Sequence, residues 1–335
     1  MFHRSNGRPP ATLNLTHTKQ TGIDDARHSG LTAEERGNWI LMTSDRCLCS
    51  AQCFRHAGWK NERSRVFDAM KLAGCSRNRL SAFAKCGSNV WICTVDSDPN
   101  QLALLGNYCR DRLCLPCANA RAATVRSNLV DFVRNKTLRL VTLTLQSSTS
   151  PLKDQLDHLY ASFRRLRHCN AWATTVTGGA AFLEITFNGK TGLWHPHLHV
   201  ILESGYFHQS MLSDLWRTAS RGSFVVHITL ARNTDNVAQY VTKYVTKGIH
   251  THGIPTLHKL AEAIAALAGR RLALTFGSWV GTPLTSVANP HLLTPMEPLD
   301  CILKEASHGS TTAILTLLKY GRLLHREHAP APHPP

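Results

Sequence analysis

The pattern of hydrophobic and polar positions predicts four strands between residues 139 and 230. In each of them apolar and polar residues tend to alternate, and a period of two is typical of a strand with one buried face. The predicted strands span residues 139–145, 182–187, 194–202 and 224–230. Asn188 and Gly189 separate the second strand from the third, and this dipeptide is typical of a hairpin turn.

A helical period marks three other segments. Apolar residues recur at 152, 156, 159, 163 and 166, where they form one stripe of an amphipathic helix. Helices are also predicted for residues 236–247, with Gly248 as the end signal, and for residues 257–267. Strands and helices in this order predict an α+β fold in which an antiparallel sheet has flanking helices.

The strand at 194–202 carries the most distinctive chemistry. His195, His197 and His199 occupy alternate positions, so their imidazoles share one face while the apolar residues between them point to the other. Imidazole is the commonest metal ligand in proteins. Pro196 ties His195 to the strand start, so we expect His197 and His199 to bind a divalent cation and His195 to lie at the rim. The alternative is chance clustering in a chain with 19 histidines.

Glu184 lies across the predicted turn from these histidines. With the hairpin centred between Lys190 and Thr191, antiparallel pairing places Glu184 opposite His197. Two histidines and a carboxylate form a partial coordination sphere with open positions for water or substrate. The alternative is a surface glutamate in a salt bridge.

The predicted helix at 236–247 nearly repeats itself every four residues. On a helix, Tyr240, Lys243, Tyr244 and Lys247 form one stripe, and we expect both hydroxyls to face outward with the ammonium groups beside them. Lysines stabilise a phenolate and bind phosphate, so these four residues are candidates for catalysis. The alternative is a pair of half-buried tyrosines that only pack, with solvated lysines.

Charge and composition narrow the class of partner. The chain has 335 residues and a formal net charge of +16, which favours a polyanion such as nucleic acid over a basic surface kept for solubility. There is neither an apolar run of membrane-spanning length nor a signal-peptide core, so we expect no membrane association. Eleven cysteines without an export signal favour metal ligation in a reducing compartment over disulfides.

The cysteine spacing predicts a structural zinc site. Cys109, Cys114 and Cys117 include a C-x2-C knuckle with a further cysteine close by, and a tetrahedral site needs a fourth ligand, either Cys86 or Cys93. Cys169 and Cys301 are expected to be plain buried residues. A second metal site of less regular spacing could use Cys47, Cys49, Cys53 and His56. Basic residues around the first site are candidates for phosphate contacts, namely Arg110, Arg112 and Arg121.

These features divide the chain into four predicted regions. An N-terminal segment is polar and expected to be disordered, a cysteine-rich region precedes the catalytic domain, and the C-terminal tail is partly helical with a Pro-rich end. The regions span residues 1–37, 38–125, 126–285 and 286–335.

Together the motifs resemble the HUH endonucleases, most closely the rolling-circle replication initiators (Rep proteins) of bacterial plasmids and single-stranded DNA phages. His197-Leu198-His199 matches the His–hydrophobic–His motif, residues 140–145 resemble the first strand motif, and residues 240–247 resemble the tyrosine helix. The resemblance covers about residues 80–250 in the family's order. It implies a ferredoxin-like, RRM-like core, a cysteine-rich zinc segment ahead of the first strand, and a place in the bacterial cytoplasm.

The resemblance also implies a mechanism. A divalent ion, Mg²⁺ or Mn²⁺, orients the scissile phosphate of single-stranded DNA, and a tyrosine attacks to give a 5′-phosphotyrosyl bond and a free 3′-hydroxyl that primes replication. Some plasmid members have glutamate four residues before the tyrosine, whereas this chain has Tyr240 there and so looks like the two-tyrosine type. Tyr244 aligns with the tyrosine of single-tyrosine relatives. The resemblance implies Glu184 as the third metal ligand, at a position that varies within the superfamily.

Two other functions fit parts of the pattern. A rolling-circle transposase would use the same nuclease core on element ends, and a zinc-containing DNA-binding regulator would need neither tyrosines nor histidines. Gly189-Lys190-Thr191 echoes the end of a phosphate-binding loop, but Glu184 stands where that motif needs glycine. No ATPase is expected, so replication would need a host helicase as well as a host DNA polymerase.

Overall fold

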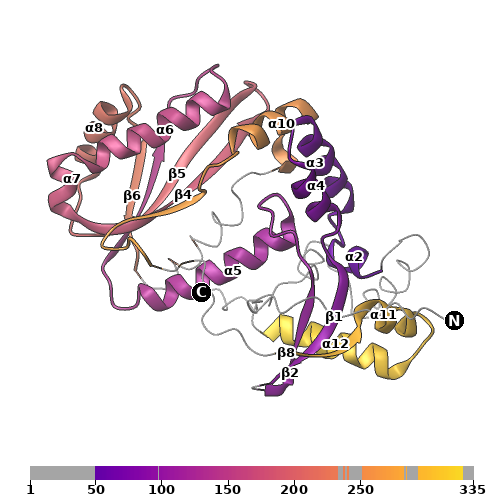
Figure 1. Ribbon diagram of the computed structural model, residues 1–335. Helices are drawn as coiled ribbons and strands as arrows, with labels where there is room; N and C mark the ends of the chain where they lie inside the picture. The colour runs from indigo at the N-terminus through magenta and orange to yellow at the C-terminus, as the bar shows by residue number, and fades with distance from the viewer. Residues whose placement is uncertain are drawn as a thin grey trace. The chain divides into compact units, whose positions relative to one another are not determined.

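The computed structural model describes residues 50–96, 98–232, 237, 240, 251–282, 284 and 293–326. It has the predicted α+β class, with antiparallel sheets flanked by helices (Figure 1). The chain divides into two compact units. The first comprises Met1–Lys60, Ser81–Ala120 and Val287–Pro335, and the second comprises Asn61–Leu80 and Arg121–Ser286.

The first unit is built on a three-stranded sheet of order β2-β1-β8, in which both pairings are antiparallel. Helices α2, α11 and α12 supply side chains to the same buried cluster as β1 and β2. The elements are α2 (Ser50–Arg55), β1 (Ser88–Val95), β2 (Asp98–Asn107), β8 (Leu293–Pro298), α11 (Leu299–Ser307) and α12 (Thr311–Arg326). Among the described helices, α4 (Arg77–Ala84) and α5 (Leu115–Phe132) have residues in both units, as does α3 (Lys60–Leu72) through its first residue, Lys60.

The second unit is built on a five-stranded sheet of order β6-β3-β5-β4-β7. Its strands are β3 (Leu138–Thr144), β4 (Val176–Asn188), β5 (Leu193–Ser204), β6 (Val226–Leu230) and β7 (Ala273–Gly277). Its helices are α3 (Lys60–Leu72), α6 (Leu152–Arg167), α7 (Asn170–Thr175), α8 (Gln209–Ser220), the 3-10 turn η2 (Thr251–Gly253) and α10 (Leu257–Ala266). Strand β5, which carries the histidines, is therefore the central strand.

Helices cover both faces of this sheet. Figure 1 shows α6 and α8 on one face. On the other face, Val125 and Leu129 of α5 lie in one buried cluster with Phe182 of β4, Ile201 of β5 and Val237. Because residues 197, 199 and 201 share a face, the histidines point toward the α5 side of the sheet. Burial on both sides explains why the sequence around the histidines is almost continuously apolar.

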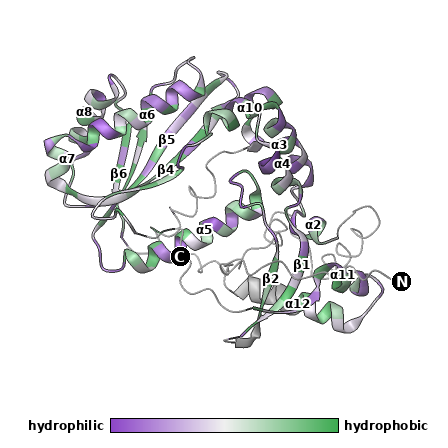
Figure 2. Cartoon of the chain, in the orientation of Figure 1, coloured by the Kyte–Doolittle hydropathy of each residue, from purple (hydrophilic) through white to green (hydrophobic). Residues whose placement is uncertain are grey.

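The predicted amphipathic helix is present as α6. All five residues of its predicted stripe, at 152, 156, 159, 163 and 166, are buried, and the ribbon of α6 shows both hydrophobic and hydrophilic colours (Figure 2). Burying each such side chain contributes about 1.5–3 kcal/mol. The backbone N–H of Leu152 in the first turn donates to Glu262 of α10 over 3.1 Å, which satisfies one of the donors that a helix start leaves unpaired.

The β4–β5 hairpin has the register that the sequence predicts. Strand β4 ends at Asn188, which pairs with Leu193, so the hairpin is centred between Lys190 and Thr191. The Asn188 side-chain oxygen accepts from the backbone N–H of Lys190 over 2.9 Å and of Thr191 over 3.3 Å. Asparagine side chains of this kind stabilise turns locally. The local signal in the loop therefore sets the pairing of the whole hairpin.

Some of the predicted segments lie outside the residues that the structure describes. Residues 1–37 and 241–248 lie outside the described residues, as does the Pro-rich end. The domains predicted at 38–125, 126–285 and 286–335 remain predictions, and the compact units group the chain differently because β8 pairs with β1. Among the described helices, none combines the length and the apolar character that crossing a bilayer requires.

We predict that Gly179→Ala destabilises the second unit, because a Cβ at Gly179 would overlap the Ile201 carbonyl oxygen of the neighbouring strand and lie 2.8 Å from Phe276 Cζ. Overpacking of this kind costs about 1–3 kcal/mol. Urea unfolding followed by circular dichroism measures the loss. Gly189→Ala is the matched control, because nothing lies within 4 Å of its added Cβ. Equal stability of the two variants would contradict the close approach of β4 and β5.

Candidate functional site

The histidine strand presents three imidazoles on the α5-facing side of the five-stranded sheet. His199 is buried, whereas His195 and His197 are half-buried. Leu198 and Val200, which alternate with them, are completely buried on the opposite face. The predicted alternation is therefore confirmed, and the neighbouring strands decide which side chains reach the imidazoles.

Glu184 of β4 lies opposite His197, as the predicted register requires. One carboxylate oxygen, Oε2, lies 2.8 Å from His199 Nε2 and 3.9 Å from His197 Nε2. Both imidazoles thus turn the same ring nitrogen toward one carboxylate. We call Glu184, His197 and His199 the histidine–glutamate cluster.

The cluster offers the kinds of donor atom that a divalent cation binds. Two imidazole nitrogens and a carboxylate oxygen form a donor set that suits Mn²⁺ and related divalent ions. In the structure, however, Glu184 Oε2 and His199 Nε2 lie at hydrogen-bond distance. Among the described residues, the metal-binding group whose ligand atoms lie close together is made of cysteines. The divalent cation at the histidines therefore stays a prediction.

Burial keeps the imidazole of His197 neutral. Loss of solvent around the ring lowers the pKa of His197 to about 4. The charge of Glu184 opposes this shift, whereas His199 and His195 add to it. A neutral imidazole has a lone pair to give to a metal, which an imidazolium lacks. At neutral pH, His197 is therefore in the form that can bind a cation.

Tyr240 reaches the cluster from the predicted tyrosine helix. Its hydroxyl donates to the carbonyl oxygen of Val141 over 3.0 Å and lies 3.2 Å from His199 Nδ1. Its ring packs against the buried cluster that includes Val237. The expectation that this hydroxyl faces outward is wrong, because β3 offers it a backbone acceptor. Lys243, Tyr244 and Lys247 lie outside the described residues.

His195 and two threonines complete the surroundings of the cluster. His195 lies near the start of β5, and its Nε2 is 3.2 Å from the hydroxyl of Ser147, which follows the end of β3. This place agrees with the predicted rim position. Thr186 Oγ1 lies 3.4 Å from His197 Nε2, and Thr142 Oγ1 lies 3.2 Å from His199 Nδ1. Neither threonine was predicted as a site residue, although Thr142 is a polar residue between the apolar Val141 and Leu143.

Four cysteines of the first unit gather into a second candidate centre. The sulfur of Cys86 lies 3.7 Å from that of Cys114 and 3.6 Å from that of Cys117, and Cys109 lies 3.7 Å from Cys117. In a tetrahedral zinc site with Zn–S distances of about 2.3 Å, neighbouring sulfurs lie about 3.8 Å apart. These four residues, the cysteine cluster, could therefore hold zinc.

Of the two predicted candidates for the fourth ligand, Cys86 lies with the other three cysteines and Cys93 does not. Cys93 is buried in β1, where its sulfur lies 3.8 Å from the Trp91 carbonyl oxygen instead of joining the cluster. Cys86 lies two residues before β1 and Cys109 lies two residues after β2, so the pairing of these strands brings the two cysteines together.

A buried arginine compensates the charge expected at the cysteine cluster. Arg55 is only 4% exposed, and it donates to Cys117 Sγ over 3.5 Å. Burial alone would lower the pKa of Arg55, but Tyr108, Cys117 and Cys86 raise it above the usual range. Arg55 Nε and Nη1 have no hydrogen-bond partner within the described part of the chain. A dianionic zinc–tetrathiolate would offset this otherwise costly buried cation.

The four thiols of the cysteine cluster shift one another's pKa in opposite directions: the pKa of Cys86 and Cys117 is lowered, whereas that of Cys109 and Cys114 is raised. Hydrogen bonds with Cys109 and Cys114 lower the pKa of Cys117 to about 7, and the thiolate is the metal-binding form. His56 Nε2 lies 3.6 Å from Cys114 Sγ. His56 thus contacts the cysteine cluster. Cys53 is disulfide-bonded, which contradicts its predicted role as a ligand of a second metal site, because a disulfide sulfur is not a thiolate. Cys47 and Cys49, the other predicted cysteine ligands of that site, lie outside the described residues.

The predicted phosphate-binding arginines differ in exposure. Arg110 is exposed and has a left-handed backbone conformation (φ 52°) next to Cys109, whereas Arg112 and Arg121 are half-buried. Their contact with DNA stays a prediction.

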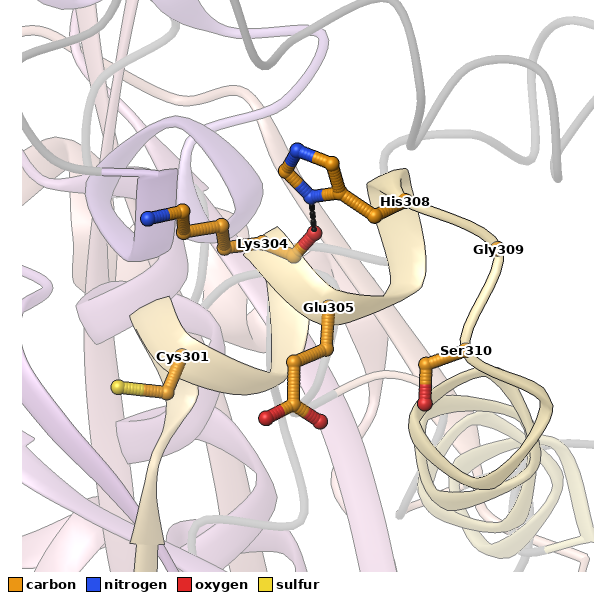
Figure 3. A pocket seen from close by; sticks show the side chains of 6 residues that line it. All are labelled: Cys301, Lys304, Glu305, His308, Gly309 and Ser310. Carbon is orange, nitrogen blue, oxygen red and sulfur yellow. Dashed lines mark hydrogen bonds between the residues drawn. The ribbon is translucent and has the colours of Figure 1, made fainter.

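A separate hollow of about 550 Å³ lies on α11 and the turn that follows it (Figure 3). His308 Nδ1 donates to the Lys304 carbonyl oxygen over 2.7 Å within it. The hollow is lined by Cys301, Lys304, Glu305, His308, Gly309 and Ser310. Cys301 is exposed, which contradicts its expected burial. This lining shares no residue with the histidine–glutamate cluster or the cysteine cluster.

The comparisons with known proteins that give a match all find replication proteins. A family model described as "Replication protein" matches residues 102–313, more than half of the chain. A Staphylococcus aureus protein named "Protein rep" is 23% identical over 193 residues, which cover 53% of this chain and 84% of that protein. No solved structure matches the chain.

Other relatives share a shorter stretch. A "Protein rep" from Bacillus amyloliquefaciens is 27% identical over 41% of this chain and 45% of its own length. One from Lactiplantibacillus plantarum is 27% identical over 42% of this chain and 53% of its own length. The chain therefore spans about half the length of these two relatives.

We predict that Cys86→Ala loses the zinc of the first unit and that Cys93→Ala keeps it. Both residues are buried cysteines, but only Cys86 lies within ligand distance of the other three sulfurs. Native mass spectrometry of the purified proteins, with zinc quantified by plasma emission, measures the metal per chain. A full complement of zinc in Cys86→Ala would exclude this cysteine as a ligand.

Proposed function

Because this chain belongs to the replication protein family, we propose that it initiates rolling-circle replication by nicking single-stranded origin DNA through a tyrosine. The family membership agrees with the resemblance to rolling-circle initiators, whereas the two-tyrosine subtype stays a prediction. The proposal rests mainly on one observation. His197 Nε2 and His199 Nε2 converge on one oxygen of Glu184, and His199 also contacts the hydroxyl of Tyr240.

A phosphodiester bound at the histidine–glutamate cluster would meet an electrophilic centre and a nucleophile. A bound Mg²⁺ or Mn²⁺ would polarise a phosphoryl oxygen and stabilise the charge that develops on it. Glu184, His197 and His199 would hold that ion, since one carboxylate oxygen and the Nε2 atoms of both imidazoles face one another. The cluster lies on the central strand β5 and its neighbour β4, so the sheet holds the three side chains in place.

The reaction exchanges one phosphodiester bond for another. The phenolic oxygen of tyrosine forms a bond to phosphorus, and the bond from phosphorus to the 3′ oxygen breaks. The phenol loses its proton and the departing 3′ oxygen gains one, which leaves a 5′-phosphotyrosyl end and a free 3′-hydroxyl primer. Lys243 and Lys247, one helical stripe with the tyrosines, would stabilise the phenolate and bind neighbouring phosphates.

The chain's charge suits the substrate. A formal net charge of +16 attracts DNA phosphates at long range. We propose that the cysteine cluster, with zinc bound, holds Arg110, Arg112 and Arg121 in place for phosphate contacts. Extension from the 3′-hydroxyl and strand separation would fall to a host DNA polymerase and a host helicase.

We predict that the wild-type protein forms a covalent adduct with labelled single-stranded origin DNA in the presence of Mn²⁺, and that Tyr240→Phe/Tyr244→Phe does not. Without a phenolic oxygen on this helix, no phosphotyrosyl bond can form. A denaturing gel detects the adduct. Cleavage that survives the double substitution would refute tyrosine transesterification. Replication from one origin, rather than strand transfer between two element ends, distinguishes the initiator from a transposase.

We also predict that His197→Ala and His199→Ala each abolish metal-dependent nicking but largely retain origin binding. Each variant removes one imidazole ligand while leaving the basic surface intact, and loss of such a catalytic group typically costs 10²-fold or more in rate. Nicking is followed on gels and binding by fluorescence anisotropy in EDTA. His208→Ala, an exposed histidine at the start of α8, is the control. Nicking at the wild-type rate by either cluster variant would exclude the ligand assignment, and would favour a non-catalytic DNA-binding regulator if the tyrosines were dispensable too.

A further inference from the structure

One face of helix α2 is turned toward the cysteine cluster. Gln52 and Arg55 are three residues apart, a spacing that places both side chains on the same side of a helix. Gln52 Nε2 donates to the carbonyl oxygen of Cys86 over 3.2 Å, and Arg55 Nη2 donates to Cys117 Sγ over 3.5 Å. This side of α2 therefore contacts the backbone of one predicted metal ligand and the sulfur of another.

The residues next to two of the ligands accommodate the Arg55 side chain. Gly87 follows Cys86, and a Cβ at Gly87 would lie 2.9 Å from Arg55 Cδ, so glycine leaves room there for the arginine stem. Tyr108 precedes Cys109, and its ring centroid lies 4.2 Å from Arg55 Cζ, a distance typical of a cation–π contact. Arg55 is thus held by the same segments that carry the ligands.

The positive charge of Arg55 is buried, and its hydrogen bonds do not fully satisfy it. Within the residues that the structure describes, Nε and Nη1 of this buried side chain have no hydrogen-bond partner. A buried cation is costly unless an anion lies beside it. A divalent metal ion with four thiolate ligands is a dianion. The burial of Arg55 is therefore explained if the cysteine cluster holds a divalent metal ion.

We propose that Arg55 is a positioning residue for the metal of the cysteine cluster. It donates to Cys117 while that sulfur is bound to the metal, and its charge balances half of the charge of the dianion. The effect is reciprocal, because a side chain that strengthens metal binding is itself held more firmly when the metal is bound. Bound metal thereby fixes α2 against the start of α5. The inference concerns metal binding and does not depend on the proposed nicking activity.

Two substitutions separate the charge of Arg55 from its packing. Arg55→Met keeps most of the apolar stem and removes the charge, whereas Arg55→Lys keeps a charge and loses the planar guanidinium. The zinc affinity of the DNA-free protein is measured by competition with a chromophoric chelator. Removing a partner of a metal ligand typically weakens metal binding about 10- to 100-fold. We expect a loss of this size in Arg55→Met and a partial recovery in Arg55→Lys.

A spectroscopic signature tests the contact between Arg55 and sulfur. With Co²⁺ in place of zinc, the thiolate-to-metal charge-transfer bands report the electron density on the sulfurs. Because an N–H donor lowers the energy of the sulfur lone pairs, Arg55→Met is expected to shift these bands to longer wavelength. Arg79→Met is the matched control, since Arg79 also donates to a cysteine sulfur, that of Cys75 over 3.3 Å, outside the cysteine cluster. It is expected to keep the zinc affinity and the bands of the wild type.

Several results would overturn the inference. They are unchanged zinc affinity in Arg55→Met, Co²⁺ bands of this variant at the wild-type wavelengths, and equal losses of affinity in Arg55→Met and Arg55→Lys. The last result would assign the effect to packing instead of charge. A wild-type protein that binds no zinc would overturn the inference as well. A protein that binds zinc but nicks no DNA would refute the proposed function alone.

A further measurement does not depend on the folding of any variant. In a crystal structure of the zinc-loaded wild-type protein, the Arg55 guanidinium is expected to keep its contact with Cys117 Sγ. A guanidinium that pairs with a carboxylate or turns toward solvent would contradict the proposed role.

Discussion

The pairing of β4 with β5 is the constraint on which the histidine–glutamate cluster depends. Side chains alternate between the two faces of a strand, so a slip of one residue would send Glu184 to the face opposite the histidines. The turn after Asn188 prevents that slip, because the asparagine side chain accepts two backbone hydrogen bonds within the loop. A surface turn thereby determines the geometry of a buried cluster.

Local patterns were enough to predict the parts of the fold that local physics determines. The α6 stripe, the histidine strand and the centre of the hairpin follow from the period of apolar residues and from turn chemistry, all within short windows of sequence. Glu184 could be placed opposite His197 for the same reason, since a hairpin has few possible registers. The cysteine knuckle was equally local, with ligands at Cys114 and Cys117 in the first turn of one helix or just before it.

The features that could not be predicted depend on contacts between distant segments. Nothing near β1 in sequence indicates that β8, about two hundred residues later, pairs with it. Arg55 lies on a short helix without a periodic signature, and its role is visible only beside the cysteine cluster. The Tyr240 hydroxyl points inward because it donates to the backbone carbonyl oxygen of Val141 on β3, and helical periodicity cannot show such an acceptor.

The cysteine cluster has a consequence for the folding of the first unit. Its ligands come from both ends of the β1–β2 hairpin and from the start of α5, so an ion bound there would crosslink segments that the unfolded chain leaves apart. Binding to the folded form alone stabilises that form in proportion to the logarithm of the free ion concentration. With zinc as the ion, the fraction of correctly folded protein would rise and fall with the concentration of free zinc.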